Sequence, residues 1–135
     1  MKTLLLILTI SFLAAPMLAQ DVRALQPLRL SVAADEEATP TDRQFNSLLR
    51  DTLGKLNAVR FTSAKFDCKV LTASTPITEG GRRTGYASAV ATLTKGADGV
   101  SLRLHISTAG TLAELADEVA GYLKREIFPT IEKRK

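Results

Sequence analysis

The fold class follows from one stretch, Val100-Ser101-Leu102-Arg103-Leu104-His105-Ile106-Ser107, in which apolar and polar residues alternate without a break. A period of two is typical of a β-strand with one buried face. We therefore expect the aliphatic side chains to point to the core and Arg103 and His105 to lie on a polar face. Residues 95–99, just before it, contain two glycines and predict a hairpin that leads back to a strand over 84–94.

Upstream, three further segments alternate in the same way and predict strands over 28–32, 59–61 and 65–75. Pro76 and the glycines that follow it are expected to end the last of these strands, because proline cannot donate to a strand ladder.

Two amphipathic helices complete the pattern. Apolar residues at three- and four-residue spacing predict one helix over 42–56, with Thr41 as its N-cap and Gln44 closing a capping box. A second helix is expected to begin at Thr111 and to end at Pro129.

The resulting order, β-α-β-β-β-α, predicts an α+β fold. Strands that follow one another between two helices favour an antiparallel sheet of four to five strands with both helices packed on one face. The other face is expected to be wet, since it would carry the charged or polar side chains Arg29, Lys69, Arg103 and His105.

The N-terminus predicts export. Lys2 precedes an apolar run over 4–15, and Ala19 is a small residue at the expected cut, as in a secretory signal peptide. The run is shorter than the roughly 20 residues that span a bilayer, which disfavours an uncleaved anchor. We expect residues 1–19 to be removed and 20–135 to form a single soluble domain, periplasmic or extracellular. The residue directly after the cut is Gln20 and not a cysteine, so the mature chain is not expected to be a lipoprotein.

Composition narrows the class of partner. The formal net charge is +4, aromatic residues are 5% and tryptophan is absent, so the stacking side chains of a nucleic-acid-binding surface are missing. The basic C-terminal tail, 133–135 with Lys124 and Arg125 before it, predicts at most weak contact with a membrane surface. Cys68 is the single cysteine, which predicts a buried thiol and no internal disulfide.

No catalytic or metal-binding set stands out, and no cofactor is expected. His105 is the single histidine, and a general base needs a nucleophile and an orienting partner. The acidic cluster Asp35, Glu36, Glu37 and Asp42 lacks the spacing and the glycine of a calcium loop. We interpret Asp42 as a first-turn helix residue instead.

The loop Gly80-Gly81-Arg82-Arg83-Thr84 is the strongest candidate for anion binding, because two guanidinium groups can hold a carboxylate or phosphate in bidentate fashion. It lacks the helix N-terminus of phosphate-binding loops. A solvated hairpin turn is therefore the competing interpretation.

The order of elements, with Gly85-Tyr86-Ala87 near the start of the third long strand, resembles that of small envelope modules of the TolB N-terminal-domain type. The resemblance covers most of residues 27–128 and implies a non-enzymatic module that serves in an envelope assembly. It carries no functional residue over to this chain. Cystatin-like folds are a competing analogy that the C-terminal helix fits badly.

We therefore expect an exported, non-catalytic module that binds another envelope protein, with Arg82, Arg83, Arg103 and His105 as candidate contacts. The alternative is a small-ligand-binding or hydrolytic protein that uses His105, with a carboxylate such as Asp67, and the Arg82-Arg83 loop. A domain of this size has little room for a cavity of about 300 Å³ or more, so none is expected.

Overall fold

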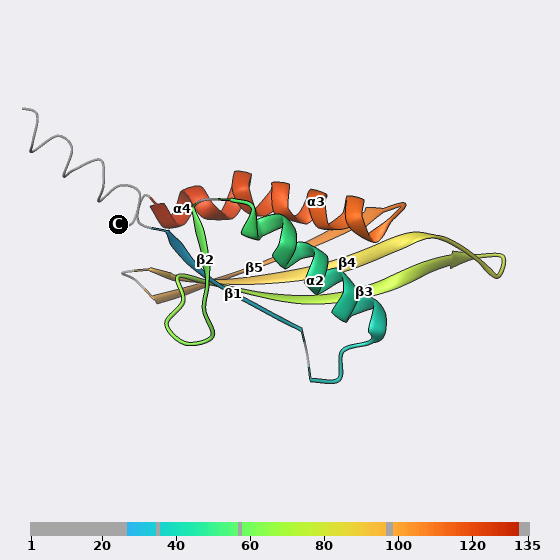
Figure 1. The fold of residues 1–135 in the computed structure, drawn as a ribbon, viewed down its shortest axis with the longest axis horizontal. Helices are drawn as coiled ribbons and strands as arrows, with labels where there is room; N and C mark the ends of the chain where they lie inside the picture. The colour runs from blue at the N-terminus through green and yellow to red at the C-terminus, as the bar shows by residue number, and fades with distance from the viewer. Residues whose placement is uncertain (1–26, 35, 57, 97–98, 133–135) are drawn as a thin grey trace, which may run out of the picture.

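A computed structural model describes residues 27–34, 36–56, 58–96 and 99–132. It is an α+β fold, as predicted, with five strands and two main helices (Figure 1). The strands and helices are, in chain order, β1 (Leu28–Ala34), α2 (Pro40–Gly54), β2 (Val59–Phe61), β3 (Cys68–Glu79), β4 (Arg82–Gly96), β5 (Gly99–Ala109), α3 (Leu112–Tyr122), the π-helical turn η1 (Leu123–Ile127) and α4 (Phe128–Glu132). The expected signal segment and the basic tail over 133–135 lie outside the described residues.

The sheet is mixed, whereas the sequence predicted an antiparallel one. Its strand order is β2-β1-β3-β4-β5, in which β1 runs parallel to both β2 and β3, and the other two neighbouring pairs are antiparallel. The reason is that α2 returns the chain to the level at which β1 begins, so that β2 runs in the same direction as β1. Phe61 and Cys68 both pair with Leu30, from opposite sides of β1, so the short segment 62–67 only has to carry the chain across β1 to the start of β3.

Both α2 and α3 cover the same face of the sheet, as expected (Figure 1). The core lies between them and that face. Its largest fully buried apolar side chains come from β1, α2, β3, β4, α3 and η1. They are Leu30, Phe45, Leu49, Leu53, Val70, Val90, Leu115, Val119, Leu123 and Ile127.

Helix α2 begins two residues earlier than predicted. Its N-cap is Thr39, whose Oγ1 accepts a hydrogen bond of 3.2 Å from the backbone N–H of Asp42. Pro40 then occupies the first helical position, which suits a residue without an N–H. Thr41 therefore lies inside the helix and is not its cap.

The last helix continues through Pro129, where the sequence predicted its end. In η1 the backbone N–H of Phe128 bonds to the carbonyl of Leu123, a wide π-helical spacing. This wider turn precedes the proline, whose ring would clash with a carbonyl in a regular helix interior. The N-cap of α3 is Thr111, as predicted, and its Oγ1 accepts from the N–H of Glu114 at 3.2 Å.

β3 also runs past Pro76, which pairs with Tyr86 of β4. β1 pairs with β3 only as far as Thr72, so at Pro76 no strand among the described residues adjoins β3 on its other side. A missing N–H is tolerated at such an edge.

Candidate functional site

The outward side of β5 is apolar. Val100, Leu102, Leu104 and Ile106 are 65%, 61%, 75% and 74% exposed, because the strand register points them away from the helices. Their neighbours on β4 and β3 continue the apolar surface across the sheet. We call this surface the open face: Leu71, Ala73, Ala89, Ala91, Leu93, Val100, Leu102, Leu104 and Ile106.

This orientation is the reverse of the predicted one, and the hairpin between β4 and β5 explains it. Gly96 pairs with Gly99, so each even-numbered residue of β4 lies opposite an odd-numbered residue of β5. Val90 is buried under the helices and pairs with His105. His105 must therefore face the helices, and the aliphatic residues of β5 must face outward.

Arg103 and His105 accordingly do not lie on the open face. The guanidinium of Arg103 donates to the carbonyl of Glu126 at 3.3 Å. The imidazole of His105 stacks on the ring of Tyr122. Both side chains connect β5 to the C-terminal helix, and these contacts explain their positions without a ligand.

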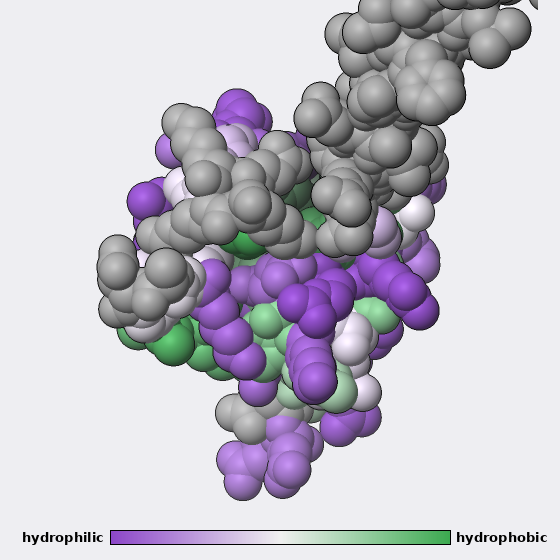
Figure 2. Space-filling view, turned by 90° about the vertical axis from the view of Figure 1, so that its left-hand side faces the viewer, coloured by the Kyte–Doolittle hydropathy of each residue, from purple (hydrophilic) through white to green (hydrophobic). Residues whose placement is uncertain are grey.

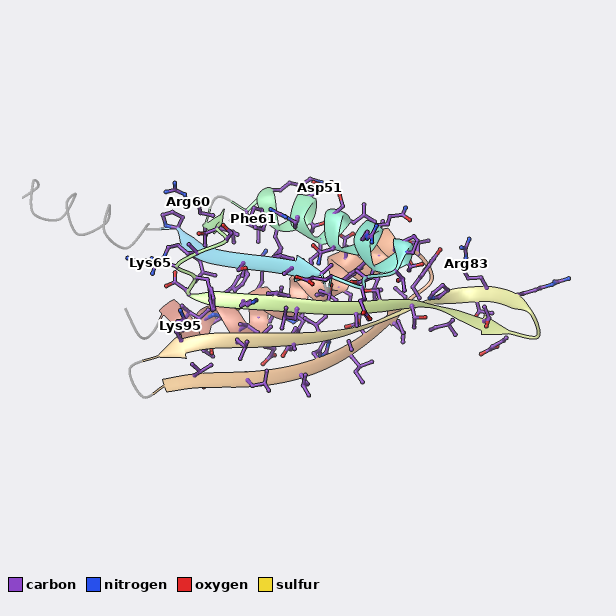
Figure 3. The ribbon with its side chains drawn as sticks, turned by 90° about the horizontal axis from the view of Figure 1, so that it is seen from below. Asp51, Arg60, Phe61, Lys65, Arg83 and Lys95 are labelled. Carbon is purple, nitrogen blue, oxygen red and sulfur yellow. The ribbon has the colours of Figure 1, made fainter. Side chains whose placement is uncertain are left out.

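One end of the same side of the sheet is basic. The strand register places Arg29, Arg60, Lys69 and Lys95 there, and Figure 3 shows Arg60 and Lys95 at this end. Of these, Arg29 forms an ion pair with Asp67 at 3.0 Å, which raises the pKa of its guanidinium through a hydrogen bond and charge attraction. Figure 2 looks along the strands at this end: hydrophilic side chains occupy much of its centre, and hydrophobic atoms gather at the lower left, the side on which β5 lies.

The predicted anion loop is the tip of the β3–β4 hairpin. Gly80 and Gly81 have φ angles of 56° and 78°, the left-handed values that a two-residue hairpin turn requires at both positions. Arg82 and Arg83 follow at the exposed end of β4, and the guanidinium carbon of Arg83 lies 5.3 Å from the ring centroid of Tyr86. The described residues bring no second element to this tip.

The residues of the hydrolytic alternative lie apart. Asp67 is bound to Arg29 at the start of β3, whereas His105 lies near the middle of β5, two strands away. The strand register places them about 10 Å apart across the sheet and about 17 Å along it. Arg83 lies seven residues along β4 from Val90, the partner of His105. The candidate residues therefore form no common site.

A groove of about 460 Å³ does exist, although the sequence predicted none of that size. It runs past residues 30–33 of β1, Phe61 at the end of β2 with the two residues after it, and the cations Arg50 and Lys69. It forms because β2 is far shorter than β1 and leaves part of the β1 edge uncovered.

The remaining candidates have structural explanations. Cys68 is fully buried, as predicted, and burial, followed by the nearby charge of Asp67, raises the pKa of its thiol to about 12. Asp42 is buried and accepts a hydrogen bond of 3.2 Å from Thr72, which in turn accepts from Asn46 at 3.0 Å.

Across the described ranges, no three histidine, cysteine or acidic side chains gather where they could hold a metal ion. No helix within those ranges is long and apolar enough to cross a membrane.

No protein-family model and no curated protein matches this sequence. Among solved structures, the chain is similar to the hypothetical protein CT253 from Chlamydia trachomatis, with 9% identity and a TM-score of 0.46. The match covers 81% of this chain and 97% of that one.

Proposed function

We propose that this protein is an exported, non-catalytic module that binds another protein of the cell envelope through the open face. The observation that carries the proposal is the outward row Val100, Leu102, Leu104 and Ile106, each more than three-fifths exposed. Contiguous apolar surface of this kind marks interaction sites on folded proteins.

The energetics of the row support burial against a partner. Fully burying one such aliphatic side chain contributes about 1.5–3 kcal/mol. Covering the exposed part of the four together would contribute roughly 4–8 kcal/mol before the costs of association.

The charges beside the open face indicate the chemistry of the partner. Lys69 and Lys95 border its apolar centre at one end. We therefore expect a partner with an apolar surface that carries carboxylate groups at one end, because complementary charges at the rim fix orientation and speed association.

The test compares two substitutions on opposite sides of one strand. Leu104→Glu places a charge in the middle of the open face, and Ser101→Glu adds the same charge on the exposed start of β5, on its other side. Each variant is recovered gently from its own envelope fraction and analysed by native mass spectrometry. We expect a defined partner on the wild type and on Ser101→Glu, and its loss from Leu104→Glu. A partner that stays bound to a folded Leu104→Glu protein would exclude the open face.

Export is a separate part of the proposal and has its own readout. The sequence of the first nineteen residues supports cleavage after Ala19. The intact mass of the recovered chain should match residues 20–135, and a mass that retains the first residues would contradict it.

A further inference from the structure

The edge of β1 is only partly covered. β2 pairs with β1 at Leu28, Arg29 and Leu30 and ends at Phe61, while β1 continues to Ala34. The final part of β1 therefore has a neighbour on its β3 side and no described strand on the other.

The hydrogen bonds show which peptide groups face that edge. The N–H of Leu28 donates to Ala58 and the carbonyl of Leu30 accepts from Thr62, both on the β2 side. The carbonyl of Arg29 accepts from Asp67 on the β3 side. Because this direction alternates along a strand, the N–H and C=O of Val32 and Ala34 point to the uncovered edge.

The groove of about 460 Å³ follows this edge. Its lining includes four consecutive residues of β1, 30–33, whose side chains alternate between the two sides of the sheet. A hollow that touches all four must pass along the backbone of the strand rather than over one face.

The groove is bordered by positive charge. Arg50 reaches it from α2, with its guanidinium carbon 5.2 Å from the ring centroid of Phe61. Lys69 reaches it from β3, across its small register partner Ser31. Its lining contains no acidic residue.

We propose that this groove binds an extended acidic peptide segment of a partner protein, which adds to β1 as a strand in line with β2. The segment exchanges backbone hydrogen bonds with Val32 and Ala34, the mode known as β-augmentation. Its carboxylates lie against Arg50 and Lys69. A span of four β1 residues is about 13 Å, which matches three to four residues of ligand. The site lies at the β1 edge and shares only Lys69 with the rim of the open face, so it does not depend on the function proposed for that face.

The test uses the peptide acetyl-Glu-Val-Glu-Val-Glu-amide at millimolar concentration with the processed chain. Amide hydrogen exchange is followed by NMR. In the free protein we expect the amides of Val32 and Ala34 to exchange much faster than those of Ser31 and Ala33, which face β3. The peptide should slow exchange at Val32 and Ala34.

Three controls make the test specific. Arg50→Glu and Lys69→Glu should each weaken peptide binding about tenfold, whereas Lys124→Glu, which makes the same charge reversal in η1, should not. The same peptide with all five backbone nitrogens N-methylated should fail to bind, because it lacks every N–H donor of the added strand.

Protected Val32 and Ala34 amides in the free protein would overturn the proposal, and so would a peptide that leaves their exchange unchanged. Equal binding of the N-methylated peptide, or equal effects from inorganic phosphate alone, would also overturn it, since either result would indicate a small-anion site. The Leu104→Glu variant should bind the peptide normally, which distinguishes this site from the open face.

Discussion

The imidazole of His105 lies flat against the ring of Tyr122, with centroids 3.9 Å apart and planes only 6° from parallel. This contact joins the edge strand β5 to the last residue of α3. The guanidinium of Arg103 donates to the carbonyl of Glu126 further along the same helix. Two polar residues of β5 are thus used to hold the helix, which leaves the aliphatic residues of the strand to face outward.

Replacing Tyr122 should release β5 from the helix. We expect Tyr122→Ala to lower the free energy of unfolding by about 2 kcal/mol, from lost ring burial and lost stacking. Tyr122→Phe keeps the ring and should change the free energy of unfolding by less than about 0.5 kcal/mol. Urea denaturation measures both. Equal stability of all three proteins would show that the stacked rings contribute nothing.

The N-cap of α2 can be tested at two threonines, Thr39 and Thr41, that lie two residues apart. Thr39→Ala removes the oxygen that accepts from the N–H of Asp42 and should lower the free energy of unfolding by about 1 kcal/mol. Thr41→Ala, inside the helix, should have a much smaller effect or stabilise slightly, since alanine is the better helix former. Thermal unfolding of both variants gives the comparison, and a larger loss from Thr41→Ala would place the cap where the sequence predicted it.

Cys68 should make stability fall in alkaline solution. Its thiol has an ordinary pKa of 9.0, which the fold raises to about 12. Below pH 9 both folded and unfolded chains keep the thiol proton, and the contribution of Cys68 to the free energy of unfolding is fully present. Between pH 9 and 12 only the unfolded chain loses it, so stability should drop by up to about 1.4 kcal/mol per pH unit.

The variant Cys68→Ala isolates this effect, because every other titrating group is common to both proteins. We expect the wild type to be more stable at pH 8 and its advantage to shrink as the pH rises above 9. Urea unfolding at several pH values measures the difference. An advantage that stays constant up to pH 11 would mean that the thiolate is tolerated in the fold.

Gly85 is a site of close approach between strands. A Cβ atom there would lie 2.6 Å from the carbonyl oxygen of Ala109, so Gly85→Ala should force β4 and β5 apart and cost about 1–3 kcal/mol. Gly54→Ala is the matched control, since its Cβ would lie at an ordinary 3.5 Å from Phe61. It should be neutral or stabilise α2 by up to about 1 kcal/mol. Equal effects on the melting temperature would contradict the close approach.

The local elements were predictable because their signals are local. The alternation over 100–107 identified β5, and Thr111 followed by Glu114 identified the start of α3. Pro40 was the missed signal in α2, since proline favours the first helical position and so points to Thr39 as the cap.

The site was less predictable, because a period of two defines two faces without saying which one is inward. The register of the β4–β5 hairpin contains the missing information: once Val90 is placed in the core, the pairing of Gly96 with Gly99 places His105 beside it. The parallel pairing of β1, and with it the groove beyond Phe61, depends on contacts between distant segments. No local pattern contains them.

Both neighbours of β1 in the sheet, β2 and β3, follow it in the chain. Roughly forty residues must emerge after β1 before β3 can pair with it, and such non-local pairing is slow. Until then only α2 and β2 can cover Leu28, Leu30 and Val32, and the part of the core formed by β3, β4 and α3 is missing, so the fold cannot be completed progressively from β1 onward. We expect nascent chains that stop before Cys68 to be fully sensitive to protease, and resistance to arise in a single late step.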